Sequence, residues 1–519
     1  MSQKSITRRR FLKSISLAAG VGASASLLAA CGGAAAPSAD TPPAADAGQA
    51  TAAPAAAGPF MGFEAANREQ WARLPADHAK GTLVSEKAWY EILGDVPKEP
   101  IVIAGFKGGW GEAWIDAVIT GLKTDFPGIQ IEKDFDPRIW EKMKPRLVAG
   151  EVPDWMYYVI GPWGGEWKKG IEEKVIVPCD FLLDVEAFGI PGKRVAEIVQ
   201  PGALASANAN LTDGQWSMPL SLSVYGLYYN VDMFEKNGWK APDQLSYEEF
   251  LEQNKKIKAA GIAPFTYPGK YPGYWEFGFL QSLWYKKAGE KAFCDMDNLV
   301  PGAFLNPDLA WGIEQVQSFF KNDWIYPGSD ALSHTESQQV FVDGKAAMIP
   351  NGSWMPNEQK ETTPPDFRMA YSGIPMPSDG KGYKDAIAFD RGAAELQVGN
   401  GKNPLWGMEV MRRIYSPTAQ RIWAEQIGSP NAMVSIVKDV KPTPAWESAA
   451  KAIERAQGHN IVLNYGAWYP ELGKQWGDSI GDIVTGKITP MDALQLLEQG
   501  AQMVRDNPDI KKLTRECKA

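Results

Sequence analysis

The pattern of hydrophobic and polar residues predicts a folded body in which strands and helices alternate. The apolar run 101–106 predicts a buried strand, and apolar positions at helical spacing follow it from Ile115 to Phe126. A second strand comes next, which completes a βαβ unit. A helix over 138–149 and a strand over 155–160 continue the alternation. The pattern therefore indicates an α/β fold.

The stretch 343–354 organises the second half of the chain. Residues 346–349 form a short apolar run that predicts a strand buried on both faces. The Pro-Asn-Gly sequence at 350–352 favours a tight turn, and Ser353 is placed to cap a short helix. Trp354 would then lie on a turn at the carboxyl end of a strand, where ligands bind in open α/β sheets. Its indole is expected to project into a cleft, so that Trp354→Ala would spare the fold.

Other local signals place the remaining elements. A Tyr-rich run over 224–230 is typical of a strand, and Ser246 and Ser333 each begin a capping box. The first capping box predicts a helix that runs through Ala260. The carboxyl-terminal part is predicted to be helical over 404–415, 418–427, 445–457 and 490–504.

The amino terminus reads as a targeting signal. A twin-arginine pattern at 7–13 precedes an apolar stretch that is too short to span a membrane. The sequence Leu28-Ala-Ala-Cys31 is similar to the lipobox of bacterial lipoproteins, which predicts removal of residues 1–31 as a signal and lipidation of Cys31. The alternative is a plain signal peptide, in which Cys31 is an ordinary small residue. Residues 32–59 are rich in Ala and Pro and are expected to form a disordered tether.

Composition narrows the kind of function. The chain has 519 residues and a net charge of -9, which disfavours nucleic-acid binding. Three His make a His-based metal centre improbable, and we expect neither a metal nor a cofactor. Besides Cys31 there are Cys179, Cys294 and Cys517, so one disulfide is possible, although unpaired thiols are the preferred interpretation. Twenty Trp are well above ordinary usage.

Three candidate site residues lie in the regions 99–222 and 390–435. Trp110 sits on the glycine-rich turn 107–111 and is either a ligand platform or a side chain packed on its neighbours. Asp154 could bind a hydroxyl group or cap a turn. Arg391 lies beside a strand break, where it could hold hydroxyls or a carboxylate in two hydrogen bonds, or form a structural ion pair.

Four further candidates lie in the rest of the body. Tyr274 and Trp275 belong to an aromatic loop rich in Gly and Pro, and a site role for them competes with core packing. Trp468 lies on a similar interruption among the last helices. With Trp354, these residues complete the predicted ligand-binding set, and no catalytic residue is predicted.

Several motifs together resemble the extracellular solute-binding proteins of bacterial sugar ABC importers. The general marks are Thr212-Asp-Gly-Gln-Trp216 before Tyr228-Tyr-Asn230, and the stretch from Asp343 to Trp354. More specific segments are similar to the N-acetylglucosamine- and diacetylchitobiose-binding lipoproteins, namely 106–109, 145–150, 260–264, 269–272, 334–338, 351–354 and 357–360.

This resemblance implies a type II, periplasmic-binding-protein-like fold with two α/β lobes and a multi-strand hinge. After a leader at 60–98, the expected lobes are 99–222 with 390–435 and 223–389 with 436–519, with crossings near Leu222, Phe389 and Ile436. It also implies a monomeric, non-enzymatic protein anchored by lipid to the outer face of the cell membrane, which delivers a sugar to ABC permease subunits. A receptor for another solute and a secreted glycoside hydrolase are the alternatives.

Overall fold

The computed structural model describes residues 68–159, 165–200, 203–204, 214–221, 223–389, 396–427, 432–433 and 443–517, all within one compact unit that spans 56–519. The targeting signal, Cys31, the tether, Arg391 and the expected crossings at Leu222 and Ile436 lie outside the described residues. In the described part, no helix is long and apolar enough to cross a membrane.

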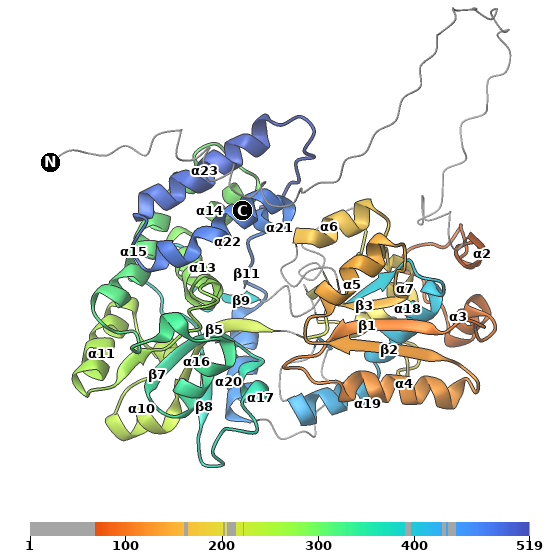
Figure 1. Cartoon of the computed structure of the whole chain (residues 1–519), viewed down its shortest axis with the longest axis horizontal. Coiled ribbons are helices and arrows are strands. Elements are labelled where there is room, and N and C mark those ends of the chain that lie inside the picture. Colours follow the sequence, from red (N-terminus) through yellow and green to blue (C-terminus); the bar gives the residue numbers. More distant parts are fainter. Residues whose placement is uncertain are drawn as a thin grey trace, which may run out of the picture. The chain divides into compact units, whose positions relative to one another are not determined.

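The first sheet contains five strands in the order β2-β1-β3-β10-β4. Its strands β2, β1 and β3 lie side by side in Figure 1. β1 (Ile101–Phe106) pairs in parallel with β2 (Ile131–Asp136), as the predicted βαβ unit requires, and with β3 (Trp155–Tyr157). β10 (Leu396–Gly399) joins the sheet antiparallel to β3 and to β4 (Ile176–Val177). Residues from distant parts of the chain therefore share one sheet.

The second sheet is organised around β5 (Val224–Asn230), in the order β11-β9-β5-β7-β6. β5 is antiparallel to β7 (Ala346–Gly352), β8 (Met369–Ser372) and β9 (Ile387–Phe389). The parallel neighbours β6 (Ala263–Phe265) and β11 (Asn460–Ile461) complete it. Both sheets thus mix parallel and antiparallel pairs, in agreement with the predicted α/β class.

The helices fall into two groups, according to which sheet contains the strands nearest to them in the sequence. Those that accompany the first are α2 (Arg68–Trp71), α3 (Glu86–Leu93), α4 (Ala113–Asp125), α5 (Ile139–Val148), α6 (Gly165–Glu172), α7 (Asp180–Asp184), α8 (Val195–Ile198), α18 (Pro404–Ile414), α19 (Pro417–Ile422) and the π-turn η6 (Trp423–Ile427). Those that accompany the second are α10 (Val231–Asn237), α11 (Tyr247–Ala259), α12 (Gly273–Trp275), the π-turn η2 (Glu276–Leu280), α13 (Gln281–Ala288), α14 (Glu290–Asp297), α15 (Pro307–Lys321), α16 (His334–Val342), α17 (Met355–Glu358), α20 (Pro444–Ala456), α21 (Tyr465–Trp468), α22 (Pro470–Val484) and α23 (Pro490–Asp506).

Both predicted capping boxes are present. Ser246 and Glu249 close the amino terminus of α11, and Ser333 and Glu336 close that of α16. Each box satisfies amide groups that have no partner inside the helix. These local signals therefore located the helix starts correctly.

The central stretch differs from the prediction in its second half. β7 continues through the Pro-Asn-Gly sequence, with Pro350 opposite Leu227 of β5. A proline is tolerated there because β6 ends opposite Met348, which leaves Pro350 without a strand on that side. The hydroxyl of Ser353 accepts a hydrogen bond from the Val224 amide instead of capping α17. The predicted tight turn and cap are therefore wrong.

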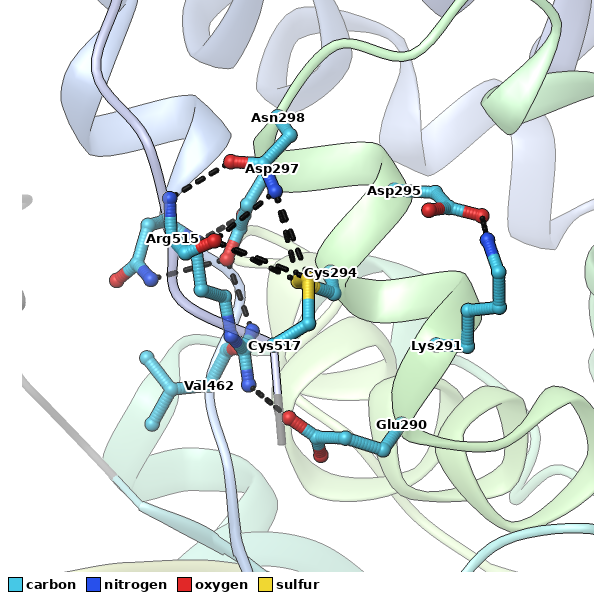
Figure 2. The surroundings of a disulfide bond; sticks show 10 residues. Glu290, Lys291, Cys294, Asp295, Asp297, Asn298, Val462, Arg515 and Cys517 are labelled. Carbon is cyan, nitrogen blue, oxygen red and sulfur yellow. Dashed lines mark hydrogen bonds and ion pairs between the residues drawn. A yellow bond between two sulfur atoms is a disulfide. The ribbon is translucent and has the colours of Figure 1, made fainter. Parts of the chain in front are cut away.

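The preference for unpaired thiols is wrong for two of the cysteines. Cys294 on α14 and Cys517 near the carboxyl end form a disulfide across 223 residues of sequence (Figure 2). Cys179 is a buried free thiol. No local pattern reveals a pairing over such a distance.

Replacing Cys294 and Cys517 together by serine is expected to lower the free energy of unfolding by about 2–5 kcal/mol, because the bond restricts the unfolded chain. Urea unfolding of the two proteins measures this loss. Reduction with dithiothreitol serves as the control and should weaken the natural chain while leaving the double variant unchanged. An equal unfolding midpoint for both proteins would contradict a stabilising role.

Candidate functional site

A cavity of about 960 Å³ is lined by helices that belong to different parts of the chain. α5 and α6 contribute one part of its wall, and the segment 271–281, α21 and α22 contribute another. The volume falls within the range of small-molecule sites in proteins. The predicted residue Tyr274 lines it, whereas the other predicted residues are absent from its described lining.

Aromatic rings connect the cavity to the end of β7. Tyr274 and Phe277 line the cavity, and the Phe277 ring stacks on Tyr225 with 5.4 Å between the ring centroids. Tyr225 meets Trp354 edge-on at 5.1 Å, and Tyr274 meets Trp354 at 6.4 Å. An aromatic face of this kind suits the apolar face of a flat ligand such as a pyranose ring.

Polar groups lie beside these rings. Glu276 begins η2, lines the cavity and is only 6% exposed. Gln281 donates a hydrogen bond to Glu276 Oε1 at 2.9 Å. Burial raises the pKa of the Glu276 carboxyl to about 7, and the hydrogen bond from Gln281 lowers it in part. The cavity thus combines aromatic surface with a buried carboxyl group.

A hydrogen-bond network centred on Asp297 fixes the position of the cavity residue Tyr465. Its backbone amide and that of Asn464 donate hydrogen bonds to Asp297 Oδ1, at 2.9 Å and 2.6 Å. Arg515 reaches the other oxygen of Asp297 at 2.9 Å and also donates to the Val462 carbonyl (Figure 2). Since the disulfide fixes the chain two residues beyond Arg515, the carboxyl-terminal tail holds the start of α21 against α14.

Some side chains of the segment 272–277 line the cavity, and another packs in the hydrophobic core. Pro272 and Gly273 start α12, and η2 follows at once. Tyr274, Glu276 and Phe277 line the cavity. Trp275 has no exposed surface, and its ring packs among Phe265, Tyr267, Phe279, Phe319 and Phe320. The alternative of core packing therefore describes Trp275.

Trp354 does not project from its turn as expected. Its indole folds back over Gly352, where an added Cβ would lie 2.2 Å from the ring, and only 8% of the residue is exposed. Trp110, which is 5% exposed, meets Trp354 edge-on at 6.1 Å and Trp423 at 4.9 Å. The structure therefore brings these two predicted residues into contact, but neither belongs to the described lining of the cavity.

Asp154 is buried and holds two backbone segments together through its carboxylate. It is 1% exposed, and its carboxylate accepts hydrogen bonds from the backbone amides of Val102 at 2.8 Å and Asn403 at 2.5 Å. Burial raises the pKa of Asp154 to about 6, and these amides lower it in part. The alternative of a backbone cap therefore describes this residue better than a hydroxyl ligand.

Trp468 is also buried, at the end of α21, and edges against Tyr469 at 6.5 Å. Sequence reasoning missed Glu276, Tyr225, Tyr465 and Trp476. Glu276 left a signal, because it is the one charged residue in the apolar run 271–280. A lone charge of this kind is rarely buried without a reason.

Comparison with known proteins relates most of the chain to solute-binding proteins. Residues 122–454 match the family of bacterial extracellular solute-binding proteins. The chain is 26% identical to the diacetylchitobiose binding protein NgcE of Streptomyces coelicolor, over 82% of this chain and 90% of that protein. It is 22% identical to the multiple sugar-binding protein of Streptococcus mutans, over 63% of this chain and 74% of the relative.

Solved structures share the fold. A chitin oligosaccharide binding protein superposes with a TM-score of 0.60 at 15% identity, over 78% of this chain and 98% of the other. The binding protein RafE, solved in complex with raffinose, gives a TM-score of 0.57 at 18% identity, over 78% and 99% of the two chains. These likenesses confirm the expected periplasmic-binding-protein-like architecture. The binding role itself comes from the family match and the curated relatives, which are solute-binding proteins and not enzymes.

The family match covers more than half of the chain. The chain is therefore a member of the bacterial extracellular solute-binding protein family.

Proposed function

We propose that this protein captures a sugar of the N-acetylglucosamine or chitobiose type in the cavity and delivers it to the permease of an ABC importer. The observation that carries the proposal is the combination of Tyr274 and Phe277 with Glu276 along one cavity wall. The rings offer flat apolar surface, and the carboxyl group fixes orientation. The diacetylchitobiose-binding relative supports this sugar class.

We also propose that the two sheets belong to two lobes that close on the ligand. Every described strand of the first sheet falls in 99–222 or 390–435, and every described strand of the second falls in 223–389 or 436–519. A ligand favours the closed form only through contacts that it gains there. Residues of α5, in the first proposed lobe, and of α22, in the second, line the same cavity. A ligand there can therefore gain contacts with both lobes when they close.

Titration calorimetry of the purified protein with a panel of small oligosaccharides tests this proposal. Diacetylchitobiose is expected to bind saturably at one site and to be recovered intact. Maltose and raffinose, which carry no acetamido group, serve as comparison sugars. Absence of heat with diacetylchitobiose, together with clear binding of another sugar, would move the protein to a different ligand class.

Membrane attachment through Cys31 is a separate part of the proposal. The Leu28-Ala-Ala-Cys31 sequence is its basis, and several acyl chains would give stable anchoring. Cys31→Ala is expected to move the protein from the membrane fraction to the soluble fraction of fractionated cells. Cys179→Ala is the matched control, because this buried thiol should not affect attachment. Tight membrane association of Cys31→Ala would contradict lipid anchoring.

A further inference from the structure

The charges along the cavity do not balance within the described residues. Four acidic residues line it, Glu141, Glu173, Glu276 and Asp478, against three lysines, Lys144, Lys169 and Lys474. Two of these lysines have acidic partners four residues further along the chain: Lys169 lies 3.5 Å from Glu173, and Lys474 lies 2.7 Å from Asp478. Glu141 lies 3.4 Å from Arg138.

Glu276 differs from the other three acids. It is deeply buried, and its neighbours in the described part of the chain are the amide of Gln281, the indole of Trp476 and the phenol of Tyr465. No lysine or arginine in that part lies within ion-pair distance of it. A buried carboxylate is costly unless it is paired with a cation or protonated. A ligand in the cavity can reach this carboxyl group, because Glu276 is part of the cavity lining.

We propose that the cavity accepts a sugar that carries a protonated amine, such as a glucosamine unit, and that Glu276 pairs with its ammonium group. The inference rests on the proposed function, because it assigns one contact within the same cavity. It extends the ligand class from the acetylated sugar to its deacetylated form. A charge-assisted hydrogen bond of this kind is about twice as strong as a neutral one.

The proposal requires that the carboxyl lose its proton when the ammonium enters. Burial raises the pKa of Glu276 to about 7, so the free protein holds a proton there at pH 6. The Tyr465 hydroxyl interacts electrostatically with Glu276, and burial raises the pKa of that hydroxyl well above its usual value. Binding of the amine at pH 6 should therefore release one proton from Glu276. A neutral acetylated sugar should release none.

The raised pKa of Glu276 also gives a way to test whether this carboxyl group serves ligand binding or stabilises the fold. An unfolded Glu loses its proton near the ordinary pKa of 4.5, whereas the folded protein keeps it up to about 7. Stability therefore falls as the pH rises through this window and stays reduced above it. E276Q removes this penalty, so its melting temperature at pH 8 should equal or exceed that of the natural protein. A structural carboxylate would give the opposite result.

The test is calorimetry of the full-length chain with three disaccharides linked β-1,4: the glucosamine disaccharide, diacetylchitobiose and cellobiose. At pH 7 the glucosamine disaccharide is expected to bind at least about ten-fold more tightly than cellobiose, and E276Q should abolish this ratio. E252Q alters an acid outside the cavity lining that also has a lysine partner, and it should keep the ratio. Titration at pH 6 in two buffers of different ionisation enthalpy counts the released proton.

Each result decides between the proposals. Equal affinity of the natural protein for the glucosamine disaccharide and cellobiose would overturn the amine site, as would an unchanged ratio in E276Q. Binding of diacetylchitobiose without the glucosamine disaccharide would overturn the amine site alone and leave the proposed function intact. Failure of all three sugars to bind would overturn both.

Discussion

Gly477→Trp should abolish sugar binding while leaving the protein folded. Gly477 lies within α22 and lines the cavity, and an added Cβ would meet no atom within 4 Å. An indole at this position would occupy the space that we assign to the sugar. We expect the dissociation constant to rise at least about a thousand-fold, which corresponds to about 4 kcal/mol. Calorimetry with diacetylchitobiose measures the loss.

Gly477→Ala is the matched control. A methyl group takes little of the cavity, and alanine in a helix interior is more stable than glycine by roughly 0.5–1 kcal/mol. Its melting temperature should therefore rise slightly, with the affinity nearly unchanged. If Gly477→Trp bound the sugar as well as the natural protein, the ligand would have to lie outside this cavity.

Trp354→Ala is expected to lower both stability and affinity, which revises the expectation from sequence that the fold would be spared. The indole is nearly buried and contacts Trp110, Tyr225 and Tyr274. Removing so large a buried side chain costs about 3–5 kcal/mol. The affinity should fall as well, because Tyr274 loses the ring that supports it. Urea unfolding and calorimetry on the same samples measure the two losses.

The more conservative Trp354→Phe keeps an aromatic ring over Gly352 and should recover most of both quantities. Comparing the unfolding midpoint with the sugar affinity distinguishes core packing by Trp354 from direct contact with the sugar. Weakened binding with an unchanged unfolding midpoint in Trp354→Ala would show that the indole contacts the sugar directly and contributes little to the core.

Local signals in the sequence were sufficient for much of the fold. The strand 101–106 and the strand 224–230 have the bounds that their apolar runs predict, and the capping boxes at Ser246 and Ser333 begin helices. These features depend on neighbours within a few residues. β7 was predicted only in part, because the tolerance for Pro350 depends on where another strand ends.

The site was harder to predict, because its residues are defined by distant partners. Asp154 looks like a polar residue at the start of a strand, but its carboxylate is used by amides 52 and 249 residues away. Tyr274 and Trp275 are adjacent in sequence, yet one lines the cavity and the other packs in the core. Which of two neighbouring aromatic side chains faces a ligand depends on the helix that they start.

We propose that the sugar lies in the cavity beside Tyr274, Glu276 and Phe277. A crystal structure of the protein grown with diacetylchitobiose tests it directly. We predict a sugar ring against Tyr274 or Phe277, with a polar group of the ligand within hydrogen-bond distance of Glu276. A sugar bound elsewhere, with this cavity filled by water alone, would contradict the account.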